Sequence, residues 1–155
     1  MFIDNSKNKE NNVLRRFHNC AKKFLLISTD KVVNPSSWMG KTKLEAEKNV
    51  LNSNLNKKNK LTSLSVIIFG NIIGSRGSVL PKFLNQIKSN ENLTVTHKNM
   101  TRFFITIDFA VNKIIDSLNI MNGGEIFIIN NMKSLKIYDL TYAIKKYLNF
   151  KKKLL

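Results

Sequence analysis

Short apolar runs alternate along this chain with longer segments of helical periodicity, and this alternation restricts the fold more than any other feature. Strand-like runs occur at 22–28, 64–71, 92–97 and 123–130. Segments with helix-like spacing occur at 13–22, 37–51, 79–89, 107–119 and 134–150. Strands that alternate with helices in this way are typical of an α/β fold with a parallel sheet.

Length and composition predict one folded domain. The chain has 155 residues, of which 43% are apolar, enough for a substantial core. We expect a frayed or disordered segment at 1–12, a single domain at 13–149 and a basic tail at 150–155. The longest apolar runs are interrupted by Gly and Asn, and the N-terminus is polar, so neither a membrane helix nor a signal peptide is expected.

The cysteine and histidine content argues against disulfide and metal chemistry. Cys20 is the single cysteine, and His18 and His97 are isolated from each other in the sequence. An internal disulfide or a cysteine-based metal site is therefore not expected, and the reducing cytoplasm is the default compartment.

The net charge of +16 raises the question of a nucleic-acid partner. Only four of the 26 basic residues are arginine, the residue favoured for bidentate phosphate and base contacts. The lysines are spread along the chain among many Asn and Ile residues, as a biased genome composition would give. A basic nucleic-acid-binding domain therefore remains the last-ranked alternative.

The first strand runs directly into Ser28, Thr29, Asp30 and Lys31. Ligands of open parallel sheets bind at the carboxyl ends of the strands. A carboxylate beside an amine in a partly desolvated cleft can act as general acid and base, although an ordinary polar turn has the same residues. Asn71 ends a second strand, and its polar groups would meet the first set if the two strands are neighbours.

The helix that follows has one face of mixed character. Ser37 is a candidate N-cap, and Met39, Lys43, Ala46 and Val50 fall on one side of the helix. Lys43 is therefore expected to point inward, where its amine can hold the hydroxyl groups of a ligand. The alternative is a lysine that extends its charged end to water.

The glycine-rich segment 70–78, "GNIIGSRGS", is a weaker signal. It lacks the spacing of a phosphate-binding P-loop, and no G-x-G-x-x-G occurs in the chain. Gly74 and Gly77 leave backbone amides accessible, and Arg76 adds a guanidinium, so the segment suits an anion such as a diphosphate.

The combination is more specific than its parts. In order, the segments "ISTDKVVNPSSWMGKTKLEAEK", "FGNIIGSRGSVLPKFLNQI", "LTVTHKNMTRFFITIDFAV" and "GGEIFIIN" closely resemble the CapD-like polysaccharide-biosynthesis proteins. These are nucleotide-sugar 4,6-dehydratases and epimerases of the extended short-chain dehydrogenase/reductase superfamily. The resemblance runs from about Asn11 to Ile144.

The resemblance implies a Rossmann-like fold that binds NAD(P) and a UDP-sugar. In the family, hydride leaves C4 of the hexose, water is eliminated across C5–C6, and hydride returns at C6. Thr29 matches the hydroxyl that hydrogen-bonds the C4 oxygen, and Asp30 and Lys31 match the pair that transfers protons in the elimination. Lys43 matches the lysine that holds the nicotinamide ribose, and Ser28 lies on the same cofactor side.

The resemblance also implies substrate contacts and one departure. Asn71, Arg76, Ser78 and Arg102 fall in segments that resemble the nucleotide-sugar-binding loops, where arginine suits the diphosphate. Met39 occupies the place of the tyrosine in Y-x-x-x-K, and a thioether cannot accept a proton. Some large, membrane-anchored dehydratases of the family also resemble this chain in having Met here, and Asp30 or Lys31 would then have to serve in place of the tyrosine.

Fewer residues precede the S-T-D-K segment than the roughly 30 that a βαβ unit needs. We therefore expect a partial Rossmann-like fold without its N-terminal strands, truncated at both ends. Its function is then that of a fragment of a UDP-N-acetylhexosamine dehydratase or epimerase, whose N-terminal half is a separate polypeptide. The alternative is a non-catalytic remnant. We also expect an exposed sheet edge that favours aggregation or a homo-oligomer, and weak NAD(P) binding by this chain alone.

Overall fold

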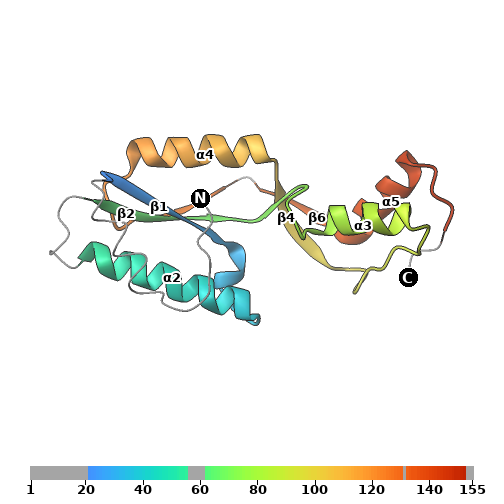
Figure 1. Ribbon diagram of the computed structural model, residues 1–155, viewed down its shortest axis with the longest axis horizontal. Helices are drawn as coiled ribbons and strands as arrows, with labels where there is room; N and C mark the ends of the chain where they lie inside the picture. The colour runs from blue at the N-terminus through green and yellow to red at the C-terminus, as the bar shows by residue number, and fades with distance from the viewer. Residues whose placement is uncertain (1–20, 56–61, 131, 153–155) are drawn as a thin grey trace. The chain divides into compact units, whose positions relative to one another are not determined.

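The computed structural model describes residues 21–55, 62–130 and 132–152. Most of the expected helix at 13–22, with His18 and Cys20, and the segment 1–12 lie outside these ranges. The elements (Figure 1) are, in chain order, β1 (Lys23–Thr29), the 3-10 turn η1 (Asp30–Val32), α2 (Trp38–Leu55), β2 (Ser63–Phe69), β3 (Asn71–Ile72), α3 (Val79–Lys88), β4 (Thr101–Ile105), α4 (Ile107–Ile120), β5 (Ile126–Ile128), β6 (Lys133–Lys136) and α5 (Ile137–Tyr147).

The chain divides into two compact units, and each is described by itself. The first comprises residues up to 67 together with 116–127, and the second comprises 68–115 together with the residues from 128 onward. The boundary between the units crosses β2, α4 and β5, so these elements contribute to both.

The first unit is built on a sheet with the strand order β1-β2-β5. Ser63 N donates to the carbonyl oxygen of Lys22, whereas Val66 N donates to the carbonyl oxygen of Glu125. The N–H and C=O groups of successive residues in a strand point to opposite edges of that strand. Alternate residues of β2 therefore bond to β1 and to β5. By the same alternation, Lys23, Leu25, Ile27 and Thr29 direct their backbone groups away from β2.

The helix α2 connects β1 to β2 and lies along one face of this sheet (Figure 1). Asn54 in its last turn accepts a hydrogen bond from Leu64 N at 3.2 Å, which joins the end of the helix to the start of β2. The buried apolar residues of the unit are Leu26, Val32, Val50, Leu64, Val66, Ile67 and Met121.

The second unit has a sheet with the order β3-β4-β6. The strands β3 and β4 are parallel, with Asn71 opposite Phe104, and β4 and β6 are antiparallel, with Thr101 opposite Lys136. Its core consists of the buried Phe83, Leu93, Phe104 and Ile137, against which α3 and α5 pack their apolar faces.

The expected α/β class with a parallel sheet is confirmed, and so are strands near 22–28, 64–71 and 123–130. The expected strand at 92–97 is wrong, because only Leu93 makes an isolated bridge there. The strand of this region is β4, which begins at Thr101, nine residues after the expected start. Leu93 is fully buried, so the apolar pattern of this segment reflects packing into the core rather than sheet pairing.

Three other expectations need correction. The helix expected at 134–150 begins only at Ile137, because residues 133–136 pair with β4 and Ile137 N donates to the Met100 carbonyl oxygen. The glycine-rich segment 70–78 is not wholly a loop, since Asn71 and Ile72 form β3. The helix α2 also extends to Leu55, four residues beyond its expected end. Within the described residues, no helix combines the length and the apolar character needed to cross a bilayer.

Candidate functional site

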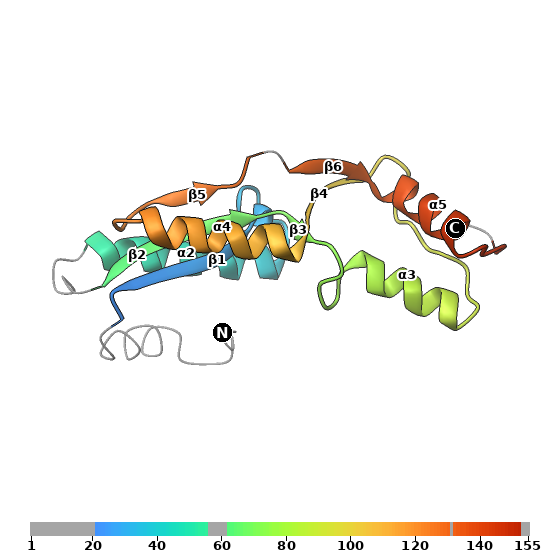
Figure 2. The same cartoon turned by 90° about the horizontal axis from the view of Figure 1, so that it is seen from above.

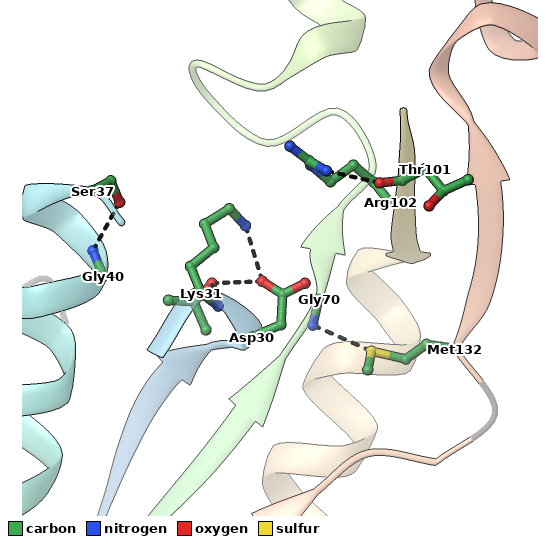
Figure 3. Close-up of polar contacts among 9 residues, drawn as sticks. Asp30, Lys31, Ser37, Gly40, Gly70, Thr101, Arg102 and Met132 are labelled. Atoms are coloured by element: carbon green, nitrogen blue, oxygen red, sulfur yellow. Dashed lines mark hydrogen bonds and ion pairs between the residues drawn. The ribbon is translucent and has the colours of Figure 1, made fainter. Parts of the chain in front are cut away.

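Three polar side chains are joined at the carboxyl end of β1 (Figure 3). Asp30 Oδ1 accepts hydrogen bonds from the Thr29 hydroxyl at 3.1 Å and from the Lys31 ammonium at 3.0 Å. The side chains of Asp30 and Lys31 are 26% and 34% exposed, so the ion pair is accessible to a ligand while its far side is covered. A hydroxyl, a carboxylate and an ammonium are therefore held within one hydrogen-bonded group, called the Thr29–Lys31 cluster below.

The local backbone explains why these side chains converge. Thr29 is the last extended residue, and its hydroxyl accepts a weak hydrogen bond from Lys31 N at 3.5 Å, which caps η1. Val32 is 95% buried, so it anchors the turn in the core and keeps the preceding residues at the surface. The strand thus ends in a fixed turn rather than in a mobile loop.

Gly40 fixes the distance between this turn and α2. A Cβ at Gly40 would lie 2.7 Å from the Lys31 carbonyl oxygen and 3.2 Å from Pro35 Cβ. Ser37 accepts a hydrogen bond from Gly40 N through its hydroxyl at 3.2 Å, which confirms Ser37 as the N-cap (Figure 3). Only glycine allows the first turn of α2 to approach Lys31 this closely, a role that the sequence reasoning missed.

Lys43 is placed beside the strand as expected. Its ammonium donates to the carbonyl oxygen of Ile27 at 3.1 Å, just before the Thr29–Lys31 cluster. Val50 is buried as expected, but Met39 is 53% exposed. The face of α2 that is buried against the sheet contains Gly40, Glu47 and Val50, so Met39 lies at its margin rather than within it.

Among the described residues of the first unit, two buried side-chain oxygen atoms have no hydrogen-bond partner. They are the hydroxyl oxygen of Ser28 and Oε1 of Glu47, and both residues are 95% buried. Such groups are uncommon in proteins because their desolvation is not compensated. Ser28 was a candidate from the sequence, whereas Glu47 was missed, although its position one helical turn after Lys43 was a signal for the same face.

The remaining candidates belong to the second unit. Asn71 is in β3, and Arg76 and Ser78 are in the segment between β3 and α3. Arg102 is in β4, where its Nη1 donates to the Thr101 carbonyl oxygen at 2.8 Å (Figure 3). Arg76 and Arg102 are both exposed. The structure thus brings together Thr29, Asp30 and Lys31 in the first unit, with Lys43 nearby. The other four candidates, Asn71, Arg76, Ser78 and Arg102, belong to the second unit.

The segment before α3 has the backbone of an anion site. Gly74 and Gly77 adopt φ values of +76° and +75°, and open space surrounds the position of a Cβ at each. The Ser78 hydroxyl oxygen is buried without a partner, and the residue lines an apolar pocket of about 30 Å³. The N–H groups of Ser75 and Ser78 are bonded within the turn, so the features that suit an anionic group are the open space at the glycines and the N-terminus of α3.

Glu125 holds the turn that leads into β5. Its carboxylate accepts hydrogen bonds from the Ser65 hydroxyl and from the N–H groups of Asn122 and Gly123. Burial opposes ionisation of this group, but the hydrogen bond from Ser65 and those from the backbone outweigh it and lower the pKa to about 2. This carboxylate is structural, since all its partners lie within the sheet and its turn.

Comparison with known proteins agrees with this architecture. Over 118 residues the chain is 48% identical to the capsular polysaccharide biosynthesis protein CapD of Staphylococcus aureus, a match to 76% of this chain and 19% of CapD. It is 40% identical over 136 residues to an inverting UDP-N-acetylglucosamine 4,6-dehydratase of Campylobacter jejuni, 87% of this chain and 40% of that protein. The solved structure of Pen from Bacillus thuringiensis superposes with a TM-score of 0.84 at 33% identity, covering 94% of this chain and 46% of Pen.

The α/β fold of this chain is that of Pen and also, at only 15% sequence identity and a TM-score of 0.77, that of DesIV, a dTDP-glucose 4,6-dehydratase from Streptomyces venezuelae; this match covers 90% of this chain and 48% of DesIV. The family model described as polysaccharide biosynthesis protein matches residues 3–154. The chain belongs to this family. Other solved nucleotide-sugar dehydratases of the fold contain bound NAD.

The chain spans about a fifth of CapD and two fifths of the Campylobacter dehydratase. It aligns with slightly under half of Pen. The activity of those whole proteins is therefore considered below as a proposal for this chain.

Proposed function

We propose that this chain provides the proton-transfer and substrate-binding part of a UDP-N-acetylhexosamine 4,6-dehydratase or epimerase used for cell-surface polysaccharide synthesis. The observation that carries the proposal is the Thr29–Lys31 cluster, with Lys43 on the neighbouring helix. Similarity to CapD and to the Campylobacter dehydratase supports the substrate class. The lone cysteine favours the cytoplasm as the compartment.

In the dehydration, a proton leaves C5 and the C6 hydroxyl departs as water. We assign the first transfer to Asp30, whose carboxylate can accept the C5 proton, and the second to Lys31, whose ammonium can donate a proton to the C6 oxygen. The two groups are 3.0 Å apart, so the proton balance can be restored directly between them. The Thr29 hydroxyl, now donating to Asp30, would turn to the C4 oxygen of the sugar.

Lys43 and Ser28 fit the nicotinamide side of NAD(P). The Ser28 hydroxyl is buried without a partner, and the Lys43 ammonium has donor capacity beyond its bond to Ile27. When bound, this cofactor supplies hydride removal at C4 and hydride return at C6. Lys43 would hold and orient the ribose hydroxyls in that arrangement.

Because Met39 occupies the place of the tyrosine, another group must remove the proton of the C4 hydroxyl. The Met39 sulfur cannot accept that proton, and its exposed position on the first turn of α2 leaves the role to a neighbouring group. We assign this role to Asp30 as well, because it is the carboxylate of the cluster. The assignment requires Asp30, whose side chain is 26% exposed, to pass the C4 hydroxyl proton to water before it accepts the C5 proton.

The substrate diphosphate would lie in the second unit. Arg76 and Arg102 offer exposed guanidinium groups, and open space beside Gly74 and Gly77 leaves room for an anionic group to approach the backbone. Asn71 and Ser78 would hydrogen-bond the nucleotide sugar from the same segments.

The nucleotide-binding strands would come from another polypeptide segment. In the described part of the chain β1 is an edge strand, and Lys23, Leu25 and Thr29 direct backbone groups to its open side. Such an edge pairs readily with a further strand. We propose that a segment with the dinucleotide fingerprint pairs here, either encoded separately or joined to this chain; a homo-oligomer would be a second use of the same edge.

The test is to co-express the chain with a polypeptide that carries the fingerprint and the preceding strands. The purified complex is then incubated with UDP-N-acetylglucosamine and NAD(P). Loss of one water from the sugar by mass spectrometry would support a dehydratase, and an epimer of unchanged mass would support an epimerase. A complex that forms but leaves the sugar unchanged would contradict the enzymatic proposal and favour a non-catalytic remnant.

A further inference from the structure

An open apolar groove lies between α3 and α5 in the second unit, whose two helices are seen together in Figure 2. The groove has a volume of about 460 Å³ and is lined by Leu80, Leu84, Ala143, Ile144, Tyr147 and Leu148. Three of its large side chains are exposed: Tyr147 by 87%, Leu148 by 44% and Leu84 by 37%. Exposed apolar groups gathered on adjacent helices mark a binding surface more often than scattered ones do.

Lysines border this groove. Lys88 follows Leu84 by one helical turn on α3, and Lys146 precedes Tyr147 in the last turn of α5. Lys151 is exposed in the segment that follows. We call Leu84, Lys88, Lys146, Tyr147, Leu148 and Lys151 the lysine–tyrosine patch.

Two side-chain bonds keep the C-terminal segment at this end of the unit. The Lys145 ammonium donates to the Lys152 carbonyl oxygen, and the Lys152 ammonium donates to the Asn90 carbonyl oxygen just after α3. Residues 142–152 contain four lysines and no acidic residue; the carboxylates of the neighbouring segments are Asp139, in the first turn of α5, and Glu91, just after α3. Positive charge is thus concentrated beside the exposed apolar side chains.

We propose that the lysine–tyrosine patch docks the protein on a bilayer that contains anionic phospholipids. Tyrosine is well suited to the boundary between headgroups and acyl chains, because its ring is apolar and its hydroxyl is polar. Leu84 and Leu148 can enter the apolar side of this boundary, while Lys88, Lys146 and Lys151 remain at the level of the phosphates. Apolar insertion together with lysine attraction is the usual basis of peripheral membrane binding.

The same chemistry fits nucleic acid less well. The patch contains lysines but neither Arg76 nor Arg102, although arginine is favoured for phosphate and base contacts. Tyr147 has the one ring of the patch that could stack on a base, and the leucines beside it offer a nucleotide neither hydrogen bonds nor a flat ring. An anionic lipid instead offers both partners, since its headgroup can bind the lysines while its acyl chains contact the apolar side chains.

The test is flotation of the full chain with vesicles of phosphatidylcholine alone, or with one third replaced by phosphatidylglycerol. Flotation separates vesicle-bound protein from aggregates, which sink. We expect binding to the anionic vesicles that weakens with salt, and little binding to phosphatidylcholine. Equal binding to both vesicle types, or no binding to either, would overturn the proposal.

Variants separate the patch from the overall charge. The double substitution Lys146→Gln with Lys151→Gln should weaken binding roughly fivefold for each lysine, whereas Lys48→Gln with Lys98→Gln, exposed positions outside the patch, should have little effect. The change Tyr147→Ser with Leu148→Ser should weaken binding at constant charge. Equal losses of binding from both lysine pairs would contradict docking through this patch, and so would unchanged binding of the Tyr147→Ser, Leu148→Ser variant. Duplex DNA that displaces the wild type and this variant from the vesicles equally well would contradict it too.

Discussion

The Lys43 ammonium donates a hydrogen bond to the Ile27 carbonyl oxygen at 3.1 Å. This bond occupies a backbone group on the open side of β1, immediately before the Thr29–Lys31 cluster. It therefore fixes α2 against the end of the strand and places a positive charge beside the cluster. The candidate site depends on this contact between helix and strand as much as on the identity of its side chains.

The close approach of Gly40 to Lys31 predicts that Gly40→Ala displaces the turn. An added Cβ would lie 2.7 Å from a main-chain oxygen, so either η1 or the first turn of α2 must move. We expect a loss of about 1–3 kcal/mol in the free energy of unfolding. Amide NMR shifts should change for Thr29 and Lys31. The control Thr42→Ala, also in α2, should leave those shifts in place, and unchanged shifts in Gly40→Ala would contradict the packing described.

Glu125 predicts an acid-sensitive part of the stability. Its pKa is lowered from 4.5 to about 2 in the folded chain, so its contribution is fully present above about pH 5 and is lost as the pH falls toward 2. Because the group is partly exposed, we expect only about 1–2 kcal/mol. Urea unfolding followed by circular dichroism should show Glu125→Gln to be less stable than wild type at pH 7, with the difference shrinking at pH 3.

Glu91→Gln removes an exposed carboxylate and serves as the control for this series. It should leave the pH dependence of the wild type nearly intact. A Glu125→Gln difference that stays constant between pH 7 and pH 3 would show that the carboxylate is not the source of the effect.

The open edge of β1 predicts self-association of the chain when it is expressed alone. Its seven residues contain no proline, and a charge occurs only at the first position. Ile27 is 46% exposed, so Ile27→Lys should reduce association by adding a charge to the edge with little loss of packing. Sedimentation velocity measures this effect.

Val33→Lys adds the same charge outside the strand, at a position that is 82% exposed. If association depends on the strand edge, this control should associate as the wild type does. Equal reduction in both variants would assign the effect to net charge instead.

The missing dinucleotide fingerprint predicts weak cofactor binding by the chain alone. No G-x-G-x-x-G occurs in the sequence, so the amides that cradle the pyrophosphate are not provided here. Isothermal titration should detect no binding of NAD(P) in the micromolar range. Micromolar affinity would mean that Lys43 and Ser28 belong to a more complete cofactor site than we describe.

Much of the fold could be predicted from the sequence because its signals are local. The apolar run ending at Ser28, the N-cap at Ser37 and the glycine turn before β5 each follow from a few adjacent residues. The local pattern predicts the wrong structure for residues 92–97 and 133–136, because the structure there depends on partners that are distant in the sequence. Leu93 packs into the core, and Lys133 pairs with Phe104, which no local periodicity reveals.

The candidate site shows the same limit. The order Thr29, Asp30, Lys31 and the spacing to Lys43 indicated a reactive cluster, since residues at a strand end and on the next helix are brought together by a common topology. Met39 was expected on the buried face but is exposed, because the close contact with η1 is made by Gly40. Such a contact depends on backbone distances that the sequence does not encode locally.

The central claim is that Asp30 and Lys31 move the protons of a nucleotide-sugar dehydration. The most direct measurement is deuterium incorporation at C5 of UDP-N-acetylglucosamine, followed by NMR in deuterated water with NAD(P) and the co-expressed complex. We expect exchange in the wild type, a loss of about 100-fold or more in Asp30→Asn, and nearly normal exchange in the control Glu45→Gln on the exposed face of α2. Exchange in Asp30→Asn at the wild-type rate would contradict the account.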